Sequence, residues 1–203
     1  SALSRAFTPP EEFANNLGDF RSPLLFHDGS KVESAADWAK RREEILSTWH
    51  GLMGEWPPFI TEPVVEILET VKLENITRHK VRFLWTPTEK TTGYLLIPEK
   101  ASEGPRPAVL TVYYEPETAA GIDGKPDRDY AYQLAKRGFV TLSIGTAEAS
   151  QAKEYSLYWP SIEKATVEPL SMLACAAANA WHVLASRPEV DPKRIGVTGH
   201  SFG

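Results

Sequence analysis

The chain has 203 residues, of which 42% are hydrophobic, 24% charged and 10% aromatic, a composition that excludes disordered, collagen-like and disulfide-scaffold proteins. The formal net charge is −5 at pH 7, so the basic face of a nucleic-acid-binding protein is not expected. Apolar runs are only a few residues long, which predicts no membrane span. The single cysteine, Cys175, can form no internal disulfide, so cysteine usage indicates no compartment and secretion is neither shown nor excluded.

Residues 1–61 are predicted to form an arm followed by one helix. The first 33 residues are polar and irregular, as loops are. Ser34 and Asp37 resemble a capping box, and the helix that starts there should run to about Leu52 and stop near Gly54. Its apolar residues recur on one helical face, and they are Trp38, Ile45, Leu46, Trp49 and Leu52.

Residues 62–203 are predicted to begin as an antiparallel meander. Segments 64–73, 79–85 and 94–97 are rich in Val, Ile, Leu and Thr, partly alternate with polar residues, and are separated by turn-prone residues. A continuous apolar run over 107–114 follows, which is typical of a strand buried on both faces.

The second half alternates helix and strand. The pattern predicts a helix over 127–137, a strand over 139–144, a helix over 163–186 with Pro169 in its first turns, and a strand over 194–198. Such an order requires crossover connections, so the expected class is α/β, with a parallel sheet covered by helices on both faces.

The last five residues, Gly199-His-Ser-Phe-Gly203, match the pattern Gly-x-Ser-x-Gly directly after a predicted strand. In that context a serine sits on a strained turn that projects its hydroxyl above the sheet, while the glycines leave room for closely packed backbone. The pattern therefore predicts that Ser201 is a nucleophile.

With its approach, Ser186-Arg-Pro-Glu-Val-Asp-Pro-Lys-Arg-Ile-Gly-Val-Thr, this motif resembles the α/β-hydrolase superfamily, in particular its dienelactone-hydrolase and acetyl-xylan-esterase branch. The resemblance covers roughly residues 62–203. It implies a mostly parallel sheet with an antiparallel start, hydrolysis of an ester or amide by a serine without a metal or cofactor, and a triad in the order Ser, acid, His. By position, Ser201 is the nucleophile.

The resemblance also implies two backbone donors for an oxyanion. One is the N–H of Phe202, and the other follows the strand over 108–113, where many members have His-Gly. This chain has Tyr113-Tyr114-Glu115 there, so the second N–H belongs to Tyr114 or Glu115. A tyrosine hydroxyl could add a further donor, and packing is the alternative role for both tyrosines.

His200 is adjacent to Ser201, but neighbouring residues on a sharp turn point apart, so a helper or packing role is expected rather than that of the base. The other four histidines are expected to be structural or solvated. The triad acid and base are therefore expected after Gly203, in a remaining C-terminal part of the same domain, and the strand over 194–198 is expected to have an unpaired apolar edge.

Several residues are candidates for a substrate pocket at the carboxyl ends of the strands, where ligands of open α/β sheets bind. Aromatic side chains there could stack on a sugar or line an acyl pocket, or could pack a loop onto the helix over 163–186. The candidates are Tyr113, Glu148, Tyr158, Trp159 and His200.

The sequence thus predicts a serine esterase that acts on a small or carbohydrate-linked ester through an acyl-enzyme on Ser201. A serine peptidase of the same fold usually carries a propeller or cap domain, for which residues 1–61 are too short. A noncatalytic binding or scaffold protein is disfavoured by the intact serine. A metal enzyme is a weak third alternative, because the sequence has neither paired histidines at helical spacing nor a cysteine cluster.

Overall fold

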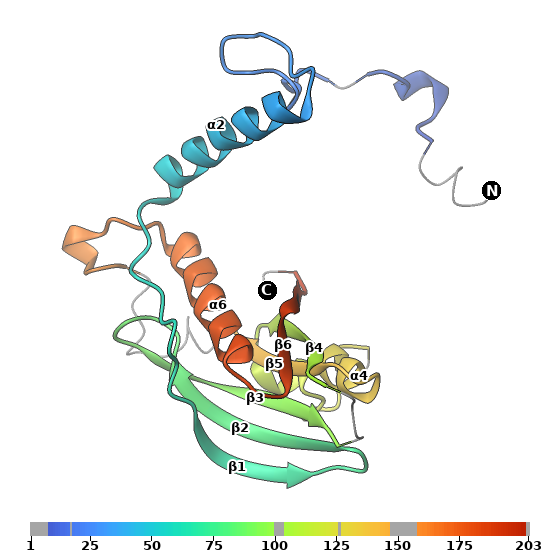
Figure 1. Cartoon of the computed structure of the whole chain (residues 1–203), viewed down its shortest axis with the longest axis vertical. Helices are drawn as coiled ribbons and strands as arrows, with labels where there is room; N and C mark the ends of the chain where they lie inside the picture. Colours follow the sequence, from blue (N-terminus) through green and yellow to red (C-terminus); the bar gives the residue numbers. More distant parts are fainter. Residues whose placement is uncertain (1–7, 17, 100–103, 126, 147–157, 202–203) are drawn as a thin grey trace. The chain divides into compact units, whose positions relative to one another are not determined.

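The computed structural model describes residues 8–16, 18–99, 104–125, 127–146 and 158–201 (Figure 1). It divides into two compact units, Ser1–Leu52 and Met53–Gly203. Each unit is described by itself below.

The first unit contains the short 3-10 helix η1 (Glu11–Phe13) and the helix α2 (Ala35–Met53). The capping box is present, because the Asp37 amide donates to Ser34 Oγ at 3.1 Å and that hydroxyl donates to Asp37 Oδ2 at 2.8 Å. Gly54, with a φ of +87°, follows the last residue of the helix. The predicted start and end of this helix are confirmed.

The second unit contains one six-stranded sheet in the order β1-β2-β3-β5-β4-β6. The pairs β1–β2, β2–β3 and β3–β5 are antiparallel, whereas β4 pairs parallel with both β5 and β6. The predicted antiparallel start and parallel continuation are confirmed. The strands are β1 (Glu66–Lys72), β2 (Ile76–Leu84), β3 (Lys90–Pro98), β4 (Arg106–Tyr113), β5 (Val140–Gly145) and β6 (Val190–Gly199).

Strand β6 is an edge strand, and among the described strands it pairs only with β4. Val197 in this strand is 70% exposed. The expected unpaired apolar edge is therefore present. Strand β6 also starts four residues earlier than predicted (194 − 190), because Val190 pairs with Arg106 before an irregularity in the register.

The helices of this unit are α3 (Pro116–Ala119), α4 (Tyr130–Lys136), the 3-10 helix η2 (Ile162–Lys164) and α6 (Pro169–Ala185). Helix α6 starts six residues later than predicted (169 − 163). Pro169 occupies its first turn and keeps the preceding Glu168 extended, with a ψ of 141°. No helix in the described part of the chain is both long and apolar enough to cross a bilayer.

Helices cover both faces of the sheet, as expected. Strand β3 shows this, because successive side chains of a strand point to opposite faces. Leu95 packs in the cluster that includes Val183 of α6, whereas the neighbouring Leu96 packs in a second cluster with Ala135 of α4. Every residue of β5 is buried, which fits a strand covered on both faces.

The segment over 53–61 makes its contacts within the second unit, although the sequence analysis grouped it with the N-terminal arm. Trp56 Nε1 donates to Ser171 Oγ of α6 at 2.5 Å, and the Ile60 amide donates to Asn179 Oδ1 at 2.9 Å. The fully buried Asn179 amide group also donates to the carbonyl of Trp85 at 2.9 Å. Asn179 therefore joins this segment to the loop after β2.

Candidate active site

The ends of β4 and β6 bring a tyrosine hydroxyl to the predicted nucleophile. In the parallel register Val112 lies beside Gly199, so Tyr114 and Ser201 each lie two residues beyond the same pair (114 − 112 and 201 − 199). Tyr114 Oη donates to Ser201 Oγ at 2.9 Å. The Tyr114 ring also packs edge-on against Tyr113, with centroids 5.2 Å apart, so both the hydroxyl and the ring make a contact here.

Ser201 has the backbone conformation that the motif predicts. Its φ is +58°, in the left-handed region that a side chain other than glycine rarely adopts. The residue is exposed, directly after β6. A left-handed conformation of this kind costs about 1–2 kcal/mol, and such strain clusters at functional sites. Here the turn presents the hydroxyl beyond the end of the sheet.

The loop between β4 and α3, which carries Tyr114, is held against β5 at short distances. The Ser143 hydroxyl donates to the Pro116 carbonyl at 2.7 Å. A Cβ atom added to Gly145 would lie 2.6 Å from Pro116 Cδ and 3.0 Å from the Tyr114 carbonyl oxygen. Only glycine allows this approach of loop to strand, so the backbone path of the loop is fixed locally.

Helix α3 is tied to the antiparallel part of the sheet as well. Tyr94 Oη on β3 donates to Glu117 Oε1 at 3.0 Å. Burial, together with this carboxylate, raises the pKa of Tyr94 well above its usual value, so the hydroxyl remains a donor. The backbone amides of Tyr114 and Glu115, the predicted oxyanion donors of this loop, have no acceptor among the described residues.

His200 is turned away from Ser201 and toward Arg128. Its Nε2 atom lies 2.9 Å from Arg128 Nη1, and its ring stacks on Tyr113 with centroids 5.6 Å apart and 27° between the planes. A guanidinium group has donors only, so His200 Nε2 must be the acceptor. This lone pair is therefore not free to take a proton from Ser201.

The side chain of Glu115 belongs to an exposed ionic group in the loop after β4. Lys125 Nζ lies 3.1 Å from Asp123 and 3.4 Å from Glu115. The hydrogen bond with Asp123 raises the pKa of Lys125 above its usual value. Exposed ion pairs of this kind contribute little to stability, so the group mainly shapes the loop.

Trp159, another candidate for the substrate pocket, packs elsewhere. It packs against a cluster of Val167, Met172 and Cys175 near the start of α6, and Tyr158 beside it is 40% exposed. Glu148 and the oxyanion candidate Phe202 lie outside the described residues. The structure therefore brings together Tyr113, Tyr114, His200 and Ser201.

Sequence reasoning missed Arg128 and the short helix α3. Pro116 at the first position of that helix is a recognisable signal for a helix start. Arg128 lies in a polar stretch without periodicity, and no sequence pattern indicates that its side chain turns to Tyr113. No three His, Cys, Asp or Glu side chains in the described ranges converge as metal ligands would.

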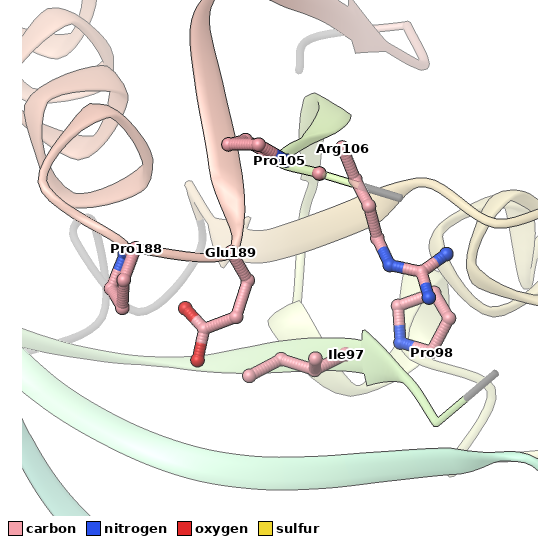
Figure 2. Close-up of a pocket in the computed structure, with 7 residues that line it drawn as sticks. Ile97, Pro98, Pro105, Arg106, Pro188 and Glu189 are labelled. Atoms are coloured by element: carbon pink, nitrogen blue, oxygen red, sulfur yellow. The ribbon is translucent and has the colours of Figure 1, made fainter. Parts of the chain in front are cut away.

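Two hollows lie at the other end of the parallel strands. One of about 400 Å³ is lined by residues at the start of β4 and just before β6 (Figure 2). A second of about 500 Å³ is lined partly by the end of α4. Arg106 and Pro98 line both.

Comparison with known proteins identifies the family. Residues 16–159, more than half of the chain, match the model of the abhydrolase family. A 4-O-methyl-glucuronoyl methylesterase of Podospora anserina is 25% identical over 197 residues, which are 93% of this chain and 36% of that protein.

Two solved structures show the same fold. A glucuronoyl esterase from Solibacter usitatus has a TM-score of 0.72 at 20% identity and covers 98% of this chain. A putative acetyl xylan esterase from Bacteroides fragilis has a TM-score of 0.66 at 17% identity and covers 91%. The chain spans 59% and 52% of those two chains, respectively. The chain belongs to the abhydrolase family and has the α/β-hydrolase fold.

Proposed function

We propose that this chain carries the nucleophile of a serine esterase that hydrolyses a carbohydrate-linked ester. The observation that carries the proposal is the hydrogen bond of 2.9 Å from Tyr114 Oη to Ser201 Oγ, made at a serine in a left-handed turn directly after β6. A strained serine at the carboxyl end of a parallel strand is the arrangement of the serine hydrolases of this fold.

In the proposed reaction, Ser201 Oγ attacks the ester carbonyl carbon and transfers its proton to a base. The oxygen of the tetrahedral intermediate takes hydrogen bonds from the Phe202 amide, from the amide of Tyr114 or Glu115, and from the Tyr114 hydroxyl. The bond to the alcohol then breaks, and the alcohol leaves with the proton. Water hydrolyses the acyl-enzyme in the same way and regenerates the serine.

The base and its acid are proposed to lie in sequence after Gly203 in the whole protein. Two facts support this. The Nε2 lone pair of His200 is occupied by Arg128. The chain also spans 36% of the Podospora relative, so that relative has room for further residues of a triad.

The proposed substrate is an ester whose carbonyl belongs to a sugar acid. The names of the Podospora relative and of the Solibacter structure support this choice. The Bacteroides structure, a putative acetyl xylan esterase, supports the alternative in which the sugar is the alcohol. The two alternatives predict different products, a sugar acid in the first and acetate in the second.

The test uses the full-length protein and a fluorophosphonate that modifies activated serines, followed by intact-mass measurement and peptide mapping. We expect one adduct, on Ser201, and none in Ser201→Ala. Ser161→Ala is the matched control, because Ser161 is a loop serine whose hydroxyl donates to the Glu163 carboxylate. Absence of an adduct on the folded wild-type protein would overturn the proposal.

The substrate class is tested on the same preparation with two esters, a methyl ester of glucuronic acid and an acetylated xylo-oligosaccharide. We expect a higher kcat/KM for the glucuronate ester. A higher kcat/KM for the acetylated sugar would show that the sugar is the alcohol part of the ester. It would not change the role proposed for Ser201.

A further inference from the structure

Arg128 joins the two residues that directly precede the reactive pair. Its Nη1 atom donates to Tyr113 Oη at 2.8 Å and lies 2.9 Å from His200 Nε2. Tyr113 is followed by Tyr114, and His200 is followed by Ser201. One guanidinium nitrogen therefore connects the end of β4 to the end of β6.

The contact fixes the tautomer of His200. Arginine has five N–H donors and no acceptor, and it keeps its proton in proteins. His200 Nε2 can accept from Arg128 only when it carries no proton. Since a neutral imidazole has one N–H, the proton of His200 must be on Nδ1.

The rings reinforce the connection. Tyr113 is 5% exposed, His200 stacks on it, and the Tyr114 ring meets it edge-on with centroids 5.2 Å apart. Arg128 Cζ lies 5.9 Å from the Tyr113 ring centroid, within the range of a cation–π contact. Displacing the Tyr113 ring would thus displace both of its neighbours.

Among the described residues, Arg128 is not part of an ion pair. No carboxylate lies within salt-bridge distance of it in the described part of the chain, whereas the nearby Lys125 pairs with Asp123 and Glu115. The described side-chain partners of Arg128 are the Tyr113 phenol and the His200 imidazole, neither of which is a carboxylate. Its contacts therefore set a geometry rather than neutralise a charge.

We infer that Arg128 is a positioning residue that clamps Tyr113 to His200 and thereby holds Tyr114 Oη at hydrogen-bond distance from Ser201 Oγ. The inference rests on the proposed function for its kinetic consequence. Misplacing reacting groups by about 1 Å can cost on the order of a hundredfold in rate, so a clamp at this position acts on kcat.

The kinetic test compares Arg128→Met and Arg128→Lys in the full-length protein. Arg137→Met is the matched control, because Arg137 follows the last residue of helix α4, whereas Arg128 precedes its first, and the exposed Arg137 side chain donates to the Gln133 carbonyl within that helix. We expect kcat to fall about tenfold to a hundredfold in Arg128→Met, with KM nearly unchanged. Lysine keeps donors at this position and should restore part of the loss, and Arg137→Met should behave as wild type.

Rates are normalised to the number of reactive serines by titration with the fluorophosphonate. A merely structural Arg128 would lower the Tm of Arg128→Met and leave kcat per reactive serine unchanged, and this result would overturn the inference.

A double mutant tests the contact between Arg128 and His200. His200→Phe keeps a ring on Tyr113 but removes the nitrogen that accepts from Arg128. In that background Arg128→Met should cost much less than in the wild type, because both changes remove the same contact.

A second measurement requires no activity. Long-range ¹H–¹⁵N spectra of ¹⁵N-histidine-labelled protein report which ring nitrogen carries the proton. We expect His200 protonated on Nδ1 in the wild type and a mixture of tautomers in Arg128→Met. Protonation on Nε2 in the wild type would overturn the clamp, whereas a protein with the expected tautomer but no turnover would overturn only the proposed function.

Discussion

The parallel strands β4, β5 and β6 have two ends, and the ends differ in what they present. Their amino ends border hollows of about 400 and 500 Å³, lined by proline, glycine and a few charged side chains such as Arg106 and Glu189. Their carboxyl ends bring Tyr114 to within 2.9 Å of Ser201. In sheets of this class ligands bind at the carboxyl ends. The comparison teaches that the direction of the parallel strands, rather than the size of a hollow, indicates at which end of the sheet the candidate active site lies.

Replacing Tyr114 gives the largest expected effect at the carboxyl end. Tyr114→Phe keeps the ring packed on Tyr113 and removes the hydroxyl that donates to Ser201. Loss of one oxyanion donor, the role proposed for this hydroxyl, costs about a hundredfold to a thousandfold in kcat. Steady-state kinetics on the preferred ester would measure this fall in kcat. Tyr132→Phe on α4 is the control, and an equal loss in both variants would contradict the role of the Tyr114 hydroxyl.

Two Gly→Ala substitutions, one at each end of the parallel strands, test whether the two ends differ in their effect on turnover. Gly145→Ala adds a Cβ 2.6 Å from Pro116 Cδ, so the loop that carries Tyr114 must shift. Overpacking of this kind costs about 1–3 kcal/mol in the free energy of unfolding, and we expect kcat to fall about tenfold. Denaturant unfolding and kinetics would measure both quantities.

Gly104→Ala is the partner substitution at the amino end. A Cβ at Gly104 meets no atom within 4 Å, so both stability and kcat should remain close to wild type. A large loss of kcat in Gly104→Ala, without a loss of stability, would show that the amino end takes part in turnover and would break the comparison.

The smallest expected effect is a pH dependence of stability that involves the amino end. Burial, together with the charge of Arg187, lowers the pKa of His79 below its ordinary value of 6.5, although Glu189 acts in the opposite direction. Below pH 6.5 the unfolded chain therefore binds more protons at this histidine than the folded chain does, and stability falls as the pH falls. Above that pH the contribution is complete.

His79→Gln should flatten this dependence in denaturant unfolding between pH 5 and 8, since the pKa of an unperturbed histidine lies within that range. The kcat per reactive serine should be the same in the variant and the wild type at pH 8. An unchanged slope of stability against pH in His79→Gln would show that other groups cause it.

Local patterns in the sequence predicted the strands and the strained turn at Ser201, the proposed nucleophile. The buried run over 107–114 and the motif that ends at Gly203 are examples. The sequence left the role of the Tyr114 hydroxyl open, because side-chain direction beyond a strand depends on the register with β6. Arg128 was missed for a similar reason, since it contacts Tyr113 and His200 across segments that are distant in sequence.

The shared register of Tyr114 and Ser201 restricts where this chain tolerates insertions and deletions. Each residue lies two positions past the pair Val112 and Gly199. One extra residue after either strand would therefore move the Tyr114 hydroxyl away from Ser201. A chimera that exchanges substrate-binding loops should therefore keep both two-residue extensions intact.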